Sequence, residues 1–384
     1  MKVRNSNYEL MRIISMFFIV IYHCIIITGG QLIEHTTGFT QMFCEFLSLI
    51  IIVHVNSFLL ISGYFQYNKQ TSLKKVWKLI RMALFYSIII ALVLNFTNII
   101  NLNFLDYVKV FSPIEFSNLW FLITYIALYL LSPYINILIE KLDQKEHRNL
   151  LILLFIMFSI IPTVTSQNTF ANNGHTLIQF IFMYILGAYF GKYSISKNIH
   201  FKNYTNKKKI AIFTFGFFFF GIINYLIFYI SKNILLMNPG NFMTYVCNSI
   251  QANTYFYQNP LIIIQSICYF LIFENFHFEN KFINYIASSV FATYIITENP
   301  YILGNLYRWV GINTGEIFDG FSIVVHMFIC SIIIFVVCII IECIRKEIIK
   351  LIKRIISKIK KMYKRKDKKN NIKKVKVKTI SVDL

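Results

Sequence analysis

The chain has 384 residues, of which 57% are hydrophobic and only 14% are charged, and its mean hydropathy is +0.59. Soluble domains carry about 25% charged residues, so this composition excludes an ordinary soluble enzyme and predicts an all-α polytopic membrane protein. The net charge of +21 does not indicate nucleic-acid binding, because 17 of the 38 lysines and arginines lie from Arg345 onward and most others lie in short loops beside apolar segments.

Apolar runs of membrane-spanning length recur along the whole chain. The first run has no small-residue cleavage site behind it, so we interpret it as a retained helix rather than a signal peptide. The runs predict about ten transmembrane helices, at residues 9–28, 44–65, 76–96, 119–139, 149–165, 176–193, 210–230, 260–273, 282–303 and 321–343.

The basic residues predict the orientation of these helices. With the N-terminus in the cytoplasm, 35 of the 38 lie in cytoplasmic segments or adjoining helix ends, and only Lys109, Lys232 and Arg308 lie outside. Because cytoplasmic loops are enriched in lysine and arginine, both termini are predicted to be cytoplasmic.

Two segments outside the spans have recognisable character. The loop at 231–259 is the longest predicted outer loop, and it has room for a lid or a re-entrant segment over a cavity. Residues 1–345 form the predicted transmembrane domain, and 346–384 a basic cytoplasmic tail. The tail begins as an amphipathic helix suited to a membrane surface and is predicted to be disordered beyond about Lys364, so membrane lipids are expected partners.

The seven cysteines are odd in number and have no metal-ligand spacing. Six of them lie in or beside apolar runs, which is typical of small buried hydrophobic residues. We expect neither a disulfide framework nor a metal site.

Arg12 and His23 stand out in the first predicted span. Eleven helical positions place them on one face, ~16 Å apart, about half the thickness of the hydrocarbon core. Such groups inside a membrane helix mark a functional site, with His23 as a general base. The alternative is a snorkelling Arg12 and a hydrogen-bonded interior His23. His54 and His326 also fall within spans, and spacing alone does not rank the three histidines.

Basic residues ring the start of the third span, where Lys78 and Arg81 share a helix face. With Arg12 they would make a cationic mouth for a phosphorylated ligand, although simple topological anchoring also explains them. Glu298, near the outer end of the ninth span, is suited to orienting a histidine, binding a sugar hydroxyl or facing the outer water.

The second span carries polar and small residues. Asn56 and Ser57 are candidates to line a cavity, whereas Ser62 and Gly63 are better explained by close helix packing.

Five stretches, in order, resemble the integral-membrane acyltransferase family three, whose members O-acylate sugars of cell-surface glycans. The N-terminal run is similar to the start of Gram-positive members, and Arg12 and His23 match the family's Arg-x10-His signature. The similar stretches cover about residues 4–305: RNSNYELMRIISM at 4–16, VNSFLLISGYF at 55–65, LWFL at 119–122, FIFMYILGAY at 180–189 and IASSVFATY at 286–294.

Two positions depart from the family pattern. Asn118 stands where the family often has a histidine before Leu-Trp-Phe-Leu, and Thr297 replaces a second histidine. Threonine cannot act as a base, so any role of that histidine is lost or taken over by another residue.

The resemblance implies an acyltransferase that uses cytoplasmic acyl-CoA, acetyl-CoA above all, as a donor substrate and holds no permanently bound cofactor. The implied acceptor is a hydroxyl of a capsule polysaccharide or exopolysaccharide, or of its lipid-linked repeat unit. Arg12, Lys78 and Arg81 would hold the CoA phosphates, and the ~16 Å between Arg12 and His23 suits an extended pantetheine arm.

By the same resemblance, His23 is the catalytic base, with Arg12 and Glu298 in the catalytic set. Residues that would bind or shape the acceptor are Asn56, Asn118, Trp120 and Tyr294. The implied location is the plasma membrane of a low-GC bacterium, which agrees with the Ile/Asn/Lys-rich composition.

Two other classes stay open from the residues alone, a glycan flippase or polymerase and a small-molecule exporter. A polysaccharide flippase would show more helices and a basic interior cavity, and a polymerase would show a large arginine-bearing outer loop. A small-molecule exporter would show inverted repeats and broken helices, which the sequence does not indicate.

Overall fold

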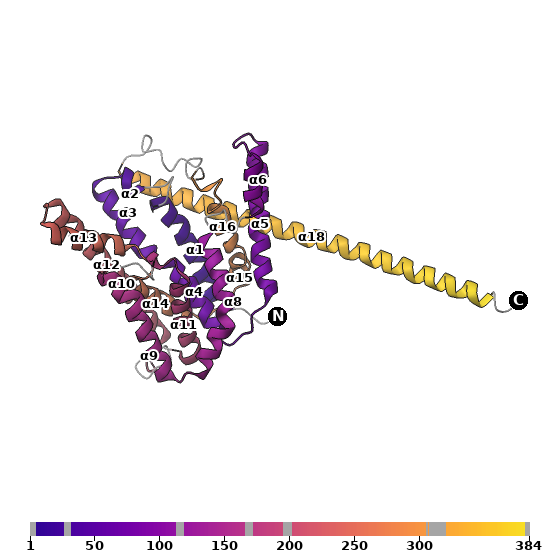
Figure 1. The fold of residues 1–384 in the computed structure, drawn as a ribbon, viewed down its shortest axis with the longest axis horizontal. Helices are drawn as coiled ribbons and strands as arrows, with labels where there is room; N and C mark the ends of the chain where they lie inside the picture. The colour runs from indigo at the N-terminus through magenta and orange to yellow at the C-terminus, as the bar shows by residue number, and fades with distance from the viewer. Residues whose placement is uncertain are drawn as a thin grey trace. The chain divides into compact units, whose positions relative to one another are not determined.

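A computed structural model describes residues 5–26, 32–112, 119–165, 172–194, 202–304, 306 and 320–380. Every regular element in these ranges is helical, and Figure 1 shows the helices in chain order. The chain divides into two compact units, Met1–Phe335 and Val336–Leu384, which we describe separately.

The first half of the chain contains α1 (Ser6–Ile26), α2 (Leu32–His35), α3 (Gly38–Ile51), α4 (His54–Gln66), α5 (Leu73–Phe96), α6 (Phe104–Phe111), α8 (Trp120–Lys141), α9 (Gln144–Phe155), a π-helical turn (Ile156–Ile160) and α10 (Ile161–Thr165). The second half contains a 3-10 turn (Asn172–Gly174), α11 (Leu177–Tyr193), α12 (Asn206–Leu236), α13 (Asn241–Thr254), α14 (Pro260–Glu274), α15 (Lys281–Ala287), α16 (Val290–Thr297) and α18 (Ser322–Ile380).

Seven segments of the described chain are long and apolar enough to cross a membrane. They are Ser6–Ile26, Gly38–Gln66, Leu73–Phe96, Trp120–Lys141, Gln144–Thr165, Asn206–Leu236 and Ser322–Lys360. Each contains most of one predicted span. The apolar helices α11 and α14 occupy two more predicted spans but are shorter, and the ninth predicted span is divided between α15 and α16. The count of ten and the orientation therefore remain predictions.

Three predicted spans are interrupted, contrary to the sequence analysis, which found no sign of broken helices. Ile52 and Val53 separate α3 from α4, a π-helical turn separates α9 from α10, and Ser288 and Ser289 separate α15 from α16. Pro162 follows the π-helical turn and lacks an N–H, which removes one hydrogen bond of the regular helix. The Ser288 hydroxyl donates to the Tyr285 carbonyl at 2.6 Å, competing with the helix ladder.

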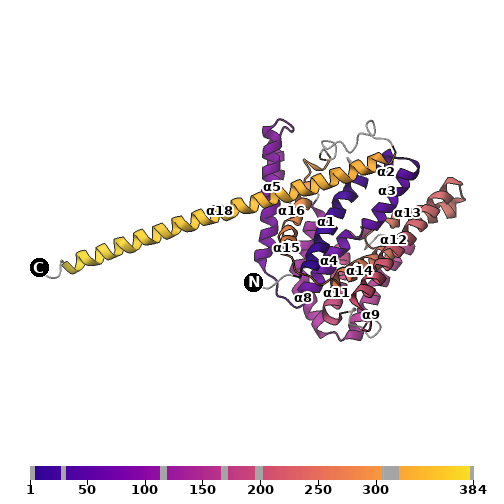
Figure 2. The same ribbon diagram turned by 180° about the vertical axis from the view of Figure 1, so that it is seen from behind.

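The helices α4 and α11 pack closely, and both ribbon views show them near the centre of the first unit (Figures 1 and 2). A Cβ atom added to Gly63 would collide with the Tyr184 carbonyl oxygen, and one added to Gly187 would collide with the Leu60 carbonyl oxygen. Glycine is therefore required on both sides of this contact, which confirms the predicted packing role of Gly63.

The second unit consists of the later part of α18. Within it, the Arg345 guanidinium donates to both oxygens of Glu342, at 2.6 and 2.7 Å. The sequence predicts disorder beyond Lys364, but the helix continues to Ile380. The continued helix agrees with the high helix propensity of lysine. The predicted domain boundary at residue 345 remains a prediction.

Candidate active site

A cavity of about 240 Å³ lies within the first unit. Its walls come from α1, α4, α8, α16, the turn between α13 and α14, and the residue His175 before α11. Most of the wall is aromatic or aliphatic, and it also carries His23, His54, His175 and Glu298. An apolar cavity with a few converging polar groups is the usual form of a small-molecule site.

His23 and Glu298 meet in this cavity. Two side-chain contacts near the start of α1 help to place the helix: Ser6 Oγ donates to Asn284 Oδ1 at 3.0 Å, and Asn7 Nδ2 to the Phe273 carbonyl at 2.8 Å. His23 is 7% exposed near the other end of α1, and Glu298, 5% exposed, caps the C-terminus of α16.

His23 Nδ1 lies 2.8 Å from Glu298 Oε1, a short contact whose angle is not that of a straight hydrogen bond. A carboxylate on Nδ1 orients the imidazole and leaves Nε2 to exchange a proton with a substrate. The structure thus brings together two residues that the sequence places on separate spans.

Arg12 does not reach the described wall of the cavity. Its Nη1 atom lies 2.8 Å from Glu9 Oε1 on the preceding turn of α1, and its side chain is 30% exposed. Arg12 is therefore available to a ligand at the helix surface rather than beside His23.

Lys78 and Arg81 are exposed on α5. The Arg81 Nε atom donates to the Trp77 carbonyl at 3.2 Å. No described contact joins Lys78 or Arg81 to Arg12, as expected for like charges, and their grouping into one cationic mouth remains a prediction.

Asn56 is fully buried behind the cavity wall and does not line it. Its Nδ2 atom donates to the Tyr257 carbonyl at 2.9 Å, and its Oδ1 atom accepts from Gln179 Nε2 at 3.4 Å. Gln179 also donates to the same Tyr257 carbonyl, at 3.2 Å. Asn56 therefore supports the wall, whereas the sequence assigned it to acceptor binding.

The segment that Asn56 supports, residues 255–259, turns back into the protein. The Tyr257 N–H donates to the Asn173 carbonyl at 3.2 Å, and Ser159 Oγ, from the π-helical turn, donates to the Gln258 carbonyl at 2.6 Å. Gly174 has a φ of +79°, and an added Cβ would lie 2.7 Å from Tyr257 Cβ, so a side chain at this position would push the turn away. This turn lies within the predicted outer loop and places Tyr255 and Tyr257 in the cavity wall, and a re-entrant position in the membrane remains a prediction.

Trp120 and Tyr294 both line the cavity. The Trp120 ring lies nearly parallel to the Tyr257 ring, with centroids 6.1 Å apart, and edge-on to His175 at 4.3 Å. Tyr294 Oη accepts the Phe121 N–H at 3.2 Å, which ties α16 to the start of α8. Asn118, the fourth predicted acceptor residue, lies outside the described residues.

Several wall residues were not singled out as site residues by sequence reasoning, notably Tyr22, His175 and Tyr257. The sequence signal that could have pointed to Tyr257 is the group of amides around it, Asn253, Gln258 and Asn259. The structure buries all three, and buried amides need hydrogen-bond partners. Thr297 is fully buried and donates to the Thr293 carbonyl at 2.9 Å, a contact within its own helix.

Comparison with known proteins adds one match. The family model of acyltransferase family three, described as an acyltransferase domain, matches residues 5–343 and so includes every cavity residue named above. Searches of curated proteins and of solved structures gave no match.

Proposed function

This chain belongs to acyltransferase family three and is a membrane acyltransferase, and we propose that it transfers an acetyl group from cytoplasmic acetyl-CoA to a hydroxyl of a surface polysaccharide or of its lipid-linked repeat unit. The observation that carries the proposal is the buried His23–Glu298 pair beside a cavity inside the matched region. The finer features, ten transmembrane helices with both termini in the cytoplasm of a low-GC bacterium, belong to the same proposal.

The chemistry follows from the pair. Nε2 of His23 takes the proton of the acceptor hydroxyl while the hydroxyl oxygen attacks the thioester carbon. The carbonyl π electrons move to its oxygen, and when the C=O bond re-forms the C–S bond breaks. The departing CoA thiolate takes the proton from His23, and Glu298 stabilises the imidazolium between the two proton transfers.

The donor site follows from the cations on the cytoplasmic side of the predicted topology. Arg12, Lys78 and Arg81 are long, accessible side chains with several N–H donors each, which suits them to the phosphates of CoA. The ~16 Å rise between Arg12 and His23 along α1 gives the pantetheine arm a path to the cavity.

The acceptor site is assigned to the aromatic part of the wall. Trp120, Tyr294 and Tyr257 present flat apolar surfaces with polar tips, which suits the faces and hydroxyls of a sugar ring. Asn56 contributes by holding Tyr257 in place.

The test is proton NMR of surface polysaccharide from the host, from a deletion strain and from strains that express wild type or His23→Ala at equal levels. We expect acetyl signals that are lost on deletion, restored by wild type and not restored by His23→Ala. His147→Ala is the matched control, because His147 is also fully buried but lies outside the cavity wall.

Two outcomes would overturn the proposal. Polymer of normal amount and length that carries no acetyl in any strain would exclude acetyl transfer. Loss of the polymer itself on deletion would favour the alternative of a flippase or polymerase.

A further inference from the structure

His54 is a second histidine in the cavity wall that the chemistry above does not use. It is the first residue of α4, directly after the interruption at Ile52 and Val53, and it is 1% exposed. Its ring meets the Tyr22 ring edge-on at a centroid distance of 5.2 Å and the Tyr257 ring at 5.7 Å. Tyr22 directly precedes His23 on α1. His23 and His54 both line the cavity, one from α1 and the other from α4.

Neither ring nitrogen of His54 has a hydrogen-bond partner among the residues that the structure describes. Buried polar atoms without partners are destabilising and uncommon, so this pair of atoms needs an explanation. His147 provides the contrast: it is fully buried as well, but only its Nδ1 atom lacks a partner among the described residues, because its Nε2 atom lies 3.2 Å from the Ile185 carbonyl oxygen. The position of His54 in the cavity wall indicates that a bound ligand supplies the missing partner.

The two histidines are suited to different tasks. His23 has a carboxylate on one nitrogen, which is the arrangement of a general base. His54 has no such partner among the described residues, but in either protonation state an imidazole keeps at least one N–H. A donor packed between aromatic rings is suited to an oxygen on which negative charge develops.

We propose that His54 donates a hydrogen bond to the carbonyl oxygen of the bound acyl thioester and to the oxyanion that forms from it. The proposal rests on the proposed acyl transfer. When the acceptor oxygen bonds to the carbonyl carbon, the π electrons move to the oxygen held by His54, and they return when the C–S bond breaks. The His54 proton is not transferred at any stage, so His54 stabilises charge while His23 moves the proton.

The first test is kinetic and uses the full-length protein in membranes of the host strain with its native acceptor, measuring CoA release from acetyl-CoA. We expect His54→Phe, which keeps a ring but removes the donor, to lower kcat by about 10²–10³-fold and to raise KM for acetyl-CoA only several-fold. His54→Asn keeps an N–H and should recover about tenfold or more of that loss. His147→Phe serves as the matched buried control.

The second test needs no turnover and separates this proposal from the proposed function. Binding of two unreactive CoA derivatives is compared: a ketone analogue of acetyl-CoA, which keeps the carbonyl, and S-ethyl-CoA, which lacks it. Wild type and His23→Ala should each bind the ketone analogue several-fold more tightly than S-ethyl-CoA. His54→Phe should bind the two derivatives with equal affinity.

Equal binding of the two derivatives by wild type, or a kcat of His54→Phe within about threefold of wild type, would overturn the role of His54. Wild-type membranes that discriminate the ketone but never acetylate the acceptor would instead overturn the proposed function and leave His54 as a carbonyl-binding residue.

Discussion

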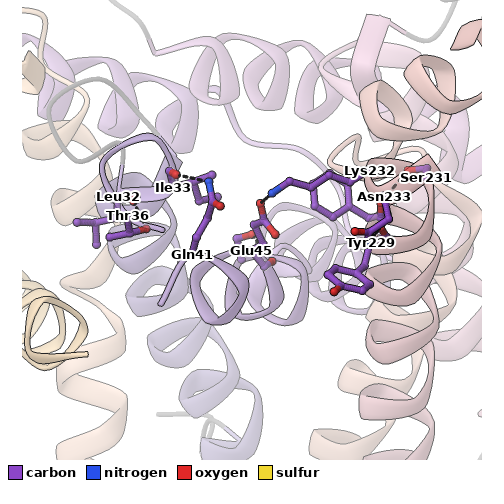
Figure 3. A network of polar contacts seen from close by, with 11 residues as sticks. Leu32, Ile33, Thr36, Gln41, Glu45, Tyr229, Ser231, Lys232 and Asn233 are labelled. Carbon is purple, nitrogen blue, oxygen red and sulfur yellow. Dashed lines mark hydrogen bonds and ion pairs between the residues drawn. The ribbon is translucent and has the colours of Figure 1, made fainter. Parts of the chain in front are cut away.

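Two buried carboxylates in the first unit each contact a nitrogen at nearly the same distance, in very different surroundings. Glu298 Oε1 lies 2.8 Å from His23 Nδ1 in the cavity wall, and Glu45 Oε1 lies 2.6 Å from Lys232 Nζ between α3 and α12. Figure 3 shows the second pair, with Lys232 reaching across from α12 to Glu45. Neither Glu45 nor Lys232 lines the cavity.

The difference lies in the partner and in the space beside it. Lys232 has a single side-chain nitrogen, which already contacts Glu45, so this pair joins two helices. Histidine has a second ring nitrogen and exchanges protons near neutral pH, and His23 faces a cavity that can hold a substrate. A short carboxylate–nitrogen distance therefore does not identify a catalytic pair unless the partner has a second nitrogen for the substrate and a cavity adjoins it.

Replacement of Glu298 by glutamine sharpens this comparison most, because it removes the charge and keeps the size. We expect the acetylation rate to fall by about 10³-fold, since the imidazolium loses its stabilising partner. Glu298 acts through His23, so the pH–rate profile should also change, and Glu298→Asp should restore part of the activity.

The control for this variant is Glu45→Gln, which removes the other buried carboxylate. If Glu45→Gln lowered the rate as much as Glu298→Gln while the protein stayed folded, the distinction between the two pairs would be wrong.

Replacement of Lys232 by methionine tests the other member of the comparison. Removal of one partner from a buried pair costs about 3–5 kcal/mol, and we expect about 2 kcal/mol here because the Lys232 side chain is 35% exposed. The loss is expected because Glu45 Oε2 has no hydrogen-bond partner within the described ranges of the chain, so the carboxylate would be left uncompensated.

Thermal unfolding of the detergent-purified protein measures this effect, and the double variant Glu45→Gln/Lys232→Met should recover most of the lost stability. The rate of acetyl transfer at low temperature should stay within about twofold of wild type. A normal unfolding temperature combined with a large loss of rate would show that this pair serves the reaction.

The sequence predicted the helical segments better than their contacts. Hydropathy located the spans because a bilayer requires about 20 apolar residues in each crossing helix. The interruptions were missed because they depend on local competition for backbone groups, such as the Ser288 hydroxyl bond to Tyr285, and leave no gap in the hydropathy.

For the site, the sequence selected His23 and Glu298 separately, but the fold was needed to show that they meet. The Glu9–Arg12 contact was within reach of sequence reasoning, because residues three apart on a helix are neighbours. The support of Tyr257 by Asn56 was not, because 201 positions separate the two residues and one chain carries no record of which distant residues touch.

Replacement of Lys78 or Arg81 by glutamine should have the smallest effect, and it extends the comparison from buried to exposed charges. Both side chains are exposed, so each contributes under about 1 kcal/mol to holding a phosphate, which corresponds to a two- to fivefold rise in KM for acetyl-CoA with little change in kcat. Added salt should weaken acetyl-CoA binding by wild type and have less effect on the double variant, because exposed charges are screened. The measurement is CoA release against acetyl-CoA concentration at two ionic strengths.

If both variants kept the wild-type KM at each ionic strength but reached the membrane in reduced amount or reversed orientation, these residues would be topological anchors. The donor site would then have to be sought around Arg12 alone.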